Sequence, residues 1–142
     1  MIRNVTLGEE IVVATKNKVG LLADMALIAV NNAINIEAVL GYEAGNTAKI
    51  LMITNANLKI ITELKKKRYK SIKETEVILV DLENRPGALK LVTMELKNNH
   101  IDIKYIYVTS PSSGASAKMV LQTSDNEKAM SLLAGYITDR PA

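Results

Sequence analysis

Two short hydrophobic runs rich in β-branched residues open two similar stretches of the chain. Ile11–Thr15 and Val77–Leu82 each lead into an Asn-basic-X-Gly sequence, which is typical of a strand that ends in a tight turn. Behind each turn the apolar residues follow helical spacing. The predicted core positions are Leu22, Met25, Ala26 and Ala29 in the first stretch and Leu89, Val92, Thr93 and Leu96 in the second. We therefore predict two helices, each closed by an Asn-Asn pair, since asparagine tolerates the left-handed conformation of a C-cap.

A strand pair and a second helix are predicted behind each of these helices. Inward-facing positions are expected to alternate, at Ile36, Ala38, Leu40 and Tyr42 in the first stretch and at Ile103, Tyr105 and Tyr107 in the second. The returning strands are Lys49–Thr54 and Lys118–Thr123, after turns at Gly45-Asn46 and Pro111–Gly114. The second helices are Leu58–Lys67 and Asn126–Leu133, the latter with Asp125 as its N-cap. A short fourth strand is expected near Tyr69–Ile72, and its counterpart near Gly135–Thr138 is left open because the sequence ends there.

The two stretches are copies of one another. Asn17–Leu22 corresponds to Asn84–Leu89 with an offset of 67 residues, and Ala48-Lys49 corresponds to Ala117-Lys118 with an offset of 69. Two copies of about seventy residues are too long and too few for a solenoid. The pattern predicts an α+β fold of two ferredoxin-like βαββαβ modules, residues 1–73 and 74–142, each with its helices on one face of an antiparallel sheet. Because no flexible linker separates them, we expect the modules to pack together.

The predicted modules carry more apolar surface than a half-solvated sheet needs. The residues expected on the face opposite the core are Val12, Val39, Leu51, Ile53, Leu79, Ile106 and Val108. The first helix is also apolar nearly all round, with Leu21, Leu27 and Ile28 outside its predicted core stripe, and such helices are usually buried on several sides. One interpretation is that the chain forms a homodimer. The other is that the strand register differs by one residue from the predicted one.

Composition narrows the function classes. With 48% hydrophobic and 23% charged residues among 142, the chain is globular rather than disordered. It has no cysteine, no signal-peptide pattern and no apolar run long enough to span a membrane, so we expect a soluble cytoplasmic protein. The net charge is +3, and a cluster at Lys65–Arg68 and Lys70 supplies most of the excess. This cluster is either a nucleic-acid patch or a solvated helix terminus, where the helix dipole favours cations.

The turn between the first strand and first helix of each copy has the strongest chemical signal. Backbone N–H groups and a partial positive charge at a helix N-terminus bind anions, and a carboxylate is an obvious candidate. Glycine lets a ligand approach the backbone. Lys18 or Arg85 would add a charge-assisted hydrogen bond, and the amide oxygen of Asn17 or Asn84 would accept one from an ammonium group. The alternative is a well-capped helix that follows a tight turn.

These residues resemble a known family. Leu82–Leu89 followed by Asn99–Ile103 is similar to the signature of the ACT domain, and Asn17–Leu22 with Ala33–Ile36 is a weaker match that has Val19 where proline is usual. The resemblance covers nearly the whole chain as two tandem modules without a catalytic domain. It implies modules that pair side by side and bind a small amino acid at their interfaces. The residues implied in binding are Asn84, Arg85, Pro86, Gly87 and Ala88, then Asn17, Lys18, Val19, Gly20 and Leu21, with Asn35 and Asp102 as further candidates.

The same sequence bears on enzymatic and nucleic-acid-binding functions. His100 is the single histidine and the sequence contains no nucleophile motif, phosphate-binding loop or metal-ligand cluster, so we expect neither an enzyme nor a cofactor. An RNA-binding module of this topology would stack bases on aromatic residues, but Tyr105 and Tyr107 are predicted to face the core. The sequence therefore predicts an amino-acid sensor that relays its state to a regulated enzyme or regulator. The alternative is a ligand-free interaction module that serves as a regulatory subunit.

Overall fold

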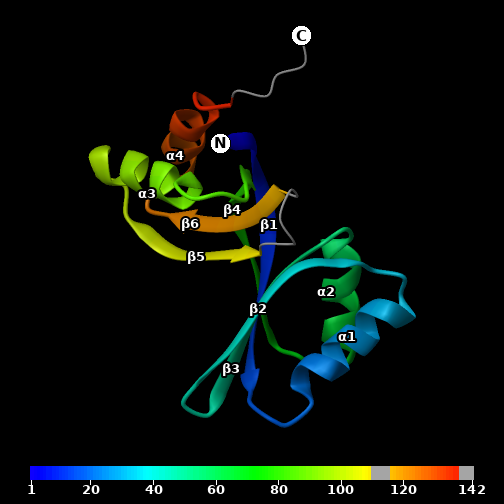
Figure 1. Ribbon diagram of the computed structural model, residues 1–142. Coiled ribbons are helices and arrows are strands. Elements are labelled where there is room, and N and C mark those ends of the chain that lie inside the picture. Colours follow the sequence, from blue (N-terminus) through cyan, green and yellow to red (C-terminus); the bar gives the residue numbers. More distant parts are fainter. Residues whose placement is uncertain (110–115, 138–142) are drawn as a thin grey trace. The chain divides into compact units, whose positions relative to one another are not determined.

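The expected order of strands and helices is present in the computed structural model, which describes residues 1–109 and 116–137 (Figure 1). In the described residues, the elements are β1 (Ile2–Lys16), α1 (Leu21–Asn31), β2 (Ile36–Ala44), β3 (Thr47–Thr54), α2 (Asn57–Lys66), β4 (Ser71–Glu83), α3 (Ala88–Asn98), β5 (Ile103–Thr109), β6 (Ser116–Thr123) and α4 (Asn126–Ala134). The predicted α+β class and the doubled βαββαβ pattern are confirmed. The predicted turn at residues 111–114 and Thr138 lie outside the described residues.

The chain divides into two compact units that are not simply its two halves. A nested unit comprises Glu9–Thr75, and a split unit comprises Met1–Gly8 together with Glu76–Ala142. The sequence pattern assigned all of residues 1–73 to the first module, whereas the first eight residues belong to the second unit in the structure. Strands β1 and β4 are both long enough to contribute one segment to each unit. The expected fourth strand near Tyr69–Ile72 is therefore the beginning of β4 rather than a separate element.

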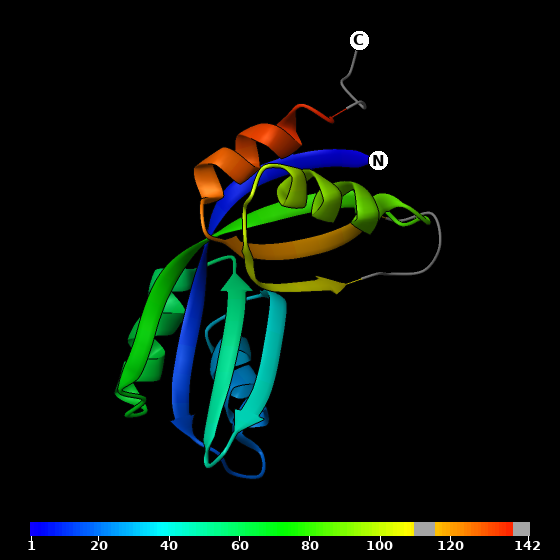
Figure 2. The ribbon, with the colours of Figure 1, turned by 90° about the vertical axis from the view of Figure 1, so that its left-hand side faces the viewer.

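Each unit has a four-stranded arrangement with two helices on one face (Figure 2). The hydrogen-bonded order is β2-β3-β1-β4 in the nested unit and β1-β4-β6-β5 in the split unit. In the split unit, the N-terminal segment of β1 takes the position of the fourth strand. Beyond α4, Ile137 forms only an isolated parallel bridge with Ile2. The chain thus completes its second module with a strand from its own beginning.

Aliphatic side chains form one core in each unit. The nested core consists of Ile11, Val13, Leu21, Met25, Ile28, Ala29, Ile34, Ala48, Ile50, Met52, Ile60 and Leu64. The split core consists of Ile2, Ile78, Val80, Leu82, Ala88, Val92, Leu96, Ile101, Ala117, Met119, Leu121, Ala129 and Leu133. On α1 the core face contains Leu21 and Ile28, which were predicted outside it, whereas Leu22 is 42% exposed. The helix is therefore rotated relative to the prediction, and its second apolar face is left uncovered within this unit.

The register of the two hairpins differs from the predicted alternation. A β-bulge follows Ile36 in β2 and another follows Ile103 in β5. Past each bulge the faces exchange, because one additional residue moves every later side chain to the opposite face. Val39, Ile106 and Val108 therefore pair with the core residues Met52, Leu121 and Met119 rather than facing away from the helices.

The bulges also reverse the expected position of two tyrosines. Tyr105 and Tyr107 were predicted to face the core, but they pair with Gln122 and Val120, which alternate with the core residues of β6. Both tyrosines lie on the sheet face opposite the helices and are partly buried, and each has an interaction partner. The argument against an RNA-binding module depended on the inward orientation predicted for these two tyrosines. The observed orientation removes that argument.

The Asn-Asn pairs end their helices in a different way from the predicted one. Asn32 and Asn99 have negative φ values of −113° and −106°, and their side-chain amides donate to the carbonyls of Ile28 at 2.9 Å and Glu95 at 2.8 Å. The left-handed residue is the next one, Ala33 in the first copy and His100 in the second. At the start of α4 the predicted cap is confirmed, since the Asp125 carboxylate accepts from the Lys128 amide at 3.1 Å.

Candidate ligand-binding site

The turn before α1 combines a left-handed glycine with an uncapped helix start. Gly20 is the N-cap at φ 85°, and no side chain caps the helix. The amide of Leu21 donates to the Lys18 carbonyl at 3.3 Å, which closes the turn and leaves Val19 fully exposed. A Cβ at Gly20 would have no atom within 4 Å, so the space above this turn is open. Apart from that of Leu21, the N–H groups of the first helical turn are therefore left for a ligand.

A groove of about 350 Å³ lies beside this turn in the nested unit. It is lined by Asn17, Lys18, Gly20, Leu21, Leu22, Ala23, Gly41, Tyr42, Glu43, Ala48 and Ile50. The sequence had predicted four of these residues, Asn17, Lys18, Gly20 and Leu21, as ligand-binding. The fifth predicted residue of this turn, Val19, projects into solvent and does not line the groove. The buried residues Ala48 and Ile50 of β3 form the floor of the groove.

The β2–β3 hairpin is fastened to the turn by Asn17. The backbone amide of Asn17 donates to the Asn46 carbonyl at 2.9 Å, and its side-chain amide donates to the Glu43 carboxylate. Because the Asn17 side chain donates through nitrogen, its amide oxygen remains available as an acceptor. Polar groups therefore surround one end of a groove whose floor is apolar.

The charges at the groove are complementary to a zwitterion. Lys18 Nζ lies 3.0 Å from Asp24 Oδ2, and the hydrogen bond and negative charge of Asp24 raise the pKa of Lys18. Lys18 therefore remains protonated at neutral pH beside the positive end of the helix, and the Asp24 carboxylate offsets its charge while the two are paired. The Glu43 carboxylate supplies a negative charge on the hairpin side. A carboxylate and an ammonium group of one small molecule would have opposite partners across the groove.

The equivalent turn of the second copy is filled differently. Gly87 has φ 93° and precedes α3 without a side-chain cap, but a Cβ there would lie 3.2 Å from Met1 Cε. Arg85 Nε is 2.6 Å from Glu83 Oε2, and Ala88 is buried in the core. Pro86 is exposed, and Asn84 has an interaction partner. The candidate residues of this copy surround a turn against which the Met1 side chain packs.

Alanine substitution of the two turn glycines should separate backbone strain from crowding. We expect Gly20→Ala to reduce the free energy of unfolding by about 1–2 kcal/mol, because left-handed backbone is unfavourable for residues with a Cβ. Gly87→Ala should cost more, since its Cβ also displaces Met1. Urea unfolding of both variants measures the difference. Equal losses would show that Met1 exerts no constraint on the second turn.

Asn35 and Asp102 lie away from both turns, beyond the C-terminal ends of α1 and α3. The Asn35 amide donates to Asn55 Oδ1 at 2.9 Å, and its carbonyl accepts from the Asn55 amide at 3.1 Å. Asp102 makes the same pair of contacts with Ser124. Their observed contacts therefore join the start of β2 and β5 to the end of β3 and β6. The turn residues and these two residues are not brought together.

Sequence reasoning missed the hairpin side of the groove. The unpredicted lining residues include Gly41, Glu43, Ala48 and Ile50, which belong to β2 and β3. The two-residue Gly45-Asn46 loop pairs Ala44 with Thr47, and this register places Glu43 opposite Ala48 and Gly41 opposite Ile50. The turn sequence was the available signal, since loop length determines hairpin register. Counting back from it would have placed these residues on the helix-covered face.

The described residues, 1–109 and 116–137, contain no cluster of His, Cys, Asp or Glu suited to hold a metal ion. No helix among them has the length and apolar character needed to cross a membrane.

Comparisons with known proteins agree with this architecture. No family model and no curated protein matches the sequence. Among solved structures, protein BT0572 from Bacteroides thetaiotaomicron is similar with a TM-score of 0.83 at 22% identity, over 92% of this chain and 89% of that one. The regulatory subunit of aspartate kinase from Thermus thermophilus, in its ligand-free form, has a TM-score of 0.65 at 10% identity, over 96% of this chain and 99% of that one. The chain has the tandem ACT fold.

A larger protein contains a region of similar fold. Escherichia coli aspartokinase III, in complex with lysine and aspartate, has a TM-score of 0.53 at 14% identity, over 97% of this chain and 33% of that one. At these identities the likeness establishes the fold alone. The groove beside Gly20 belongs to the nested module. The turn at Gly87, against which Met1 packs, belongs to the split module.

Proposed function

We propose that this tandem ACT protein is a regulatory protein that binds a small amino acid and relays the bound state to a partner, an enzyme or another regulator. The groove beside the open Gly20 turn is the observation that carries the proposal. The similar folds support it, since one neighbour is a regulatory subunit of aspartate kinase and another was solved with lysine and aspartate. With this function the chain itself performs no catalysis and needs no cofactor, and it works in the cytoplasm.

The amino acid lies with its carboxylate toward the start of α1 and its ammonium toward Glu43. The uncapped N–H groups and Lys18 stabilise the carboxylate, and Glu43 with the Asn17 amide oxygen accepts from the ammonium. The side chain of the ligand lies over Ala48 and Ile50. The volume of about 350 Å³ suits a small residue better than a large aromatic one.

The nested module is the competent copy in this proposal. The residue equivalent to Gly41 in the second copy is Val108, and the residue equivalent to Glu43 is Ser110. The second copy therefore has a larger side chain where the groove has open space, and it lacks the carboxylate that would bind the ammonium. Since Met1 also packs against Gly87, we expect one bound amino acid per chain.

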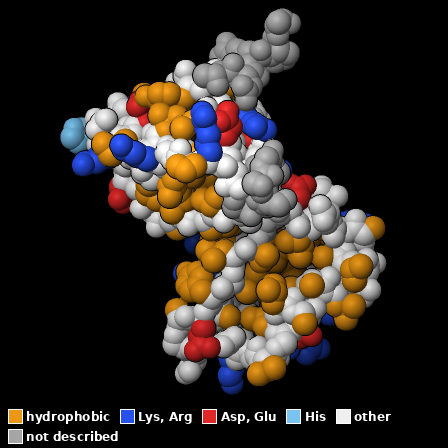
Figure 3. All heavy atoms as spheres, viewed as in Figure 1, with side chains coloured by type: hydrophobic (Ala, Val, Ile, Leu, Met, Phe, Trp, Pro, Cys, Tyr) orange, Lys and Arg blue, Asp and Glu red, His pale blue; other side chains and the backbone are white. Residues whose placement is uncertain are grey.

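The chain acts as a homodimer through the uncovered face of α1. Leu22, Ala23, Ala26 and Val30 form an exposed apolar stripe on this helix, which Figure 3 shows as hydrophobic side chains gathered where α1 lies beside β2. The equivalent positions on α3 are Leu89, Lys90, Thr93 and Lys97. This helix face is therefore entirely apolar on α1, whereas on α3 three of its four residues are polar or charged.

A second copy of the chain suits this face because the stripe contains small residues and because β2 ends the strand order of the nested unit. Small side chains let two helices approach closely, and an edge strand has free backbone groups for pairing. The ligand groove opens between α1 and the same edge strand. A ligand there would favour one arrangement of the two chains, and this differential affinity is the coupling that a partner senses.

A thermal melt of the protein with each of the twenty amino acids tests the proposed sensor. At one hundred times its dissociation constant, the cognate amino acid should add about 2.7 kcal/mol to the stability, while the others give no shift. Sedimentation equilibrium of the same samples measures the dimer. If no amino acid raises the melting temperature but the dimer is present, the ligand-free interaction module is the correct function.

A further inference from the structure

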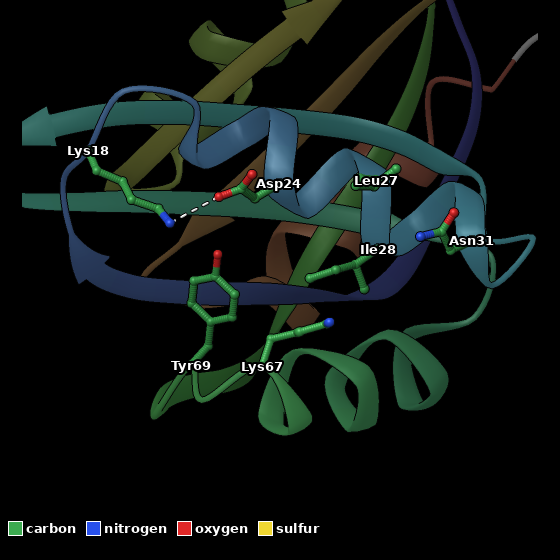
Figure 4. Close-up of a pocket in the computed structure, with 7 residues that line it drawn as sticks. All are labelled: Lys18, Asp24, Leu27, Ile28, Asn31, Lys67 and Tyr69. Carbon is green, nitrogen blue, oxygen red and sulfur yellow. Dashed lines mark ion pairs between the residues drawn. The ribbon is translucent and has the colours of Figure 1, made fainter.

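A second cavity of the nested unit lies on the other side of α1, toward α2. Its volume is about 280 Å³, and its walls are Lys18, Asp24, Leu27, Ile28, Asn31, Lys67 and Tyr69 (Figure 4). Lys67 is the C-cap residue of α2, and Tyr69 follows in the connection to β4. The cavity therefore has donors on one wall and the aliphatic side chains of Leu27 and Ile28 on another.

Charges in the cavity leave one cation uncompensated. Lys18 Nζ is paired with Asp24 Oδ2 at 3.0 Å, whereas Lys67 forms no ion pair within the described part of the chain. In Figure 4 the Tyr69 hydroxyl points toward the Lys18–Asp24 pair, and the Lys67 side chain extends below Ile28. The neighbouring Lys65, Lys66 and Arg68 raise the local concentration of anions further.

The second copy shows what the cavity lacks. There the corresponding cavity is lined by Leu91, Met94, Glu95, Asn98 and Tyr136, and the Tyr136 hydroxyl donates to Glu95 Oε2 at 2.5 Å, a hydrogen bond that raises the pKa of Tyr136. The residue equivalent to Glu95 in the first copy is Ile28. Among the described residues, 1–109 and 116–137, the Tyr69 hydroxyl has no hydrogen-bond partner. The cavity of the first copy thus also has a tyrosine in its wall, but Ile28 stands where the second copy has the carboxylate acceptor.

We propose that this cavity binds a small aliphatic monocarboxylate, whose carboxylate takes the place of Glu95 as acceptor for the tyrosine hydroxyl. Lys67 neutralises the single negative charge, Tyr69 donates a hydrogen bond, and Leu27 with Ile28 covers the hydrocarbon body. One uncompensated cation matches one carboxylate, and the Asp24 carboxylate disfavours a doubly charged anion such as phosphate. The site is separate from the amino-acid groove, although Lys18 lines both.

A nuclear magnetic resonance titration of the whole protein with 3-methylbutanoate tests the site. We expect saturable shifts of the Lys67 and Tyr69 amides, and no such shifts with 3-methylbutylamine, which has the same body but the opposite charge. Inorganic phosphate should bind at least tenfold more weakly. Shifts that are absent at high millimolar 3-methylbutanoate, or equal with the amine, would overturn the proposal.

Variants that line only this cavity separate it from the groove. Lys67→Gln should weaken 3-methylbutanoate binding at least tenfold, and Tyr69→Phe several-fold. The matched controls are Lys65→Gln, in the last turn of α2 but outside the cavity, and Tyr136→Phe, in the corresponding cavity of the second copy. Both controls should bind as the wild type does. Since Gly41→Val alters the groove alone, it should leave this site unaffected, so failure of either proposal is recognisable without the other.

Discussion

Replacing Gly41 with valine should abolish the stabilisation of the protein by its cognate amino acid. Gly41 lines the groove, and a Cβ there would lie 3.0 Å from Ile50 Cδ1, so a valine side chain occupies the space intended for the ligand. A concentration that stabilises the wild type by about 2.7 kcal/mol should give no shift in the melting temperature of the variant. Calorimetric titration measures the same loss directly.

The fold should tolerate this change. The second copy has Val108 at the equivalent position of β5, and β-branched residues are favoured in strands. Ala44→Val is the matched control, because Ala44 is exposed on the same strand but does not line the groove. If Gly41→Val binds the amino acid as tightly as Ala44→Val does, the groove is not the site.

A second variant, Glu43→Gln, tests the charge of the groove rather than its volume. Glu43→Gln preserves the shape of the side chain but removes the negative charge that faces the ammonium group. Hydrogen bonds to charged groups contribute about 1.5–3 kcal/mol, so we expect binding to weaken about 10- to 100-fold. An unchanged affinity would mean that the ammonium group lies elsewhere in the groove.

Placing a glutamate on the uncovered face of α1 should convert the protein to a monomer. Ala26 lies within the exposed apolar stripe, and in a two-fold interface Ala26→Glu brings two like charges into a desolvated contact. Like-charge contacts of this kind cost several kcal/mol, so the dimer dissociation constant should rise by a factor of at least about 100. Sedimentation equilibrium over a range of concentrations measures this constant.

The internal repeat provides the control for this experiment. Thr93 occupies the equivalent position on α3, where Lys90 and Lys97 stand in place of Ala23 and Val30, so Thr93→Glu should leave the dimer intact. A wild-type protein that is monomeric at all concentrations would refute the proposed interface. So would an Ala26→Glu variant that dimerises as well as Thr93→Glu.

Much of the fold was accessible from local patterns. The repeat predicted two βαββαβ modules, and the turn sequences marked Gly20 and Gly87, both of which have the left-handed backbone that glycine favours. Helix spacing correctly identified Met25 and Val92 as core residues. These features depend on interactions within about four residues, which the sequence displays directly.

The faces of the hairpin strands were not accessible in this way. A single additional residue after Ile36 and after Ile103 moves Val39 and Tyr105 to the faces opposite those predicted. Nothing within β2 or β5 marks the bulges, because they arise in the pairing across each hairpin, where Ile36 lies opposite Thr54 and Ile103 opposite Thr123. Periodicity alone therefore identified the strands correctly but assigned the residues past each bulge to the wrong face of the sheet.

The sequence by itself determined the repeated module, its element order and the glycine turns, because these follow from short-range spacing and backbone preference. Only the tertiary structure decided that residues 2–8 complete the second unit, since any edge position of a sheet accepts a strand from either end of the chain. It also decided that the first turn is open while Met1 packs against the second. Both outcomes depend on contacts between residues about eighty positions apart, and pairwise contacts over such distances leave no periodic trace in one sequence.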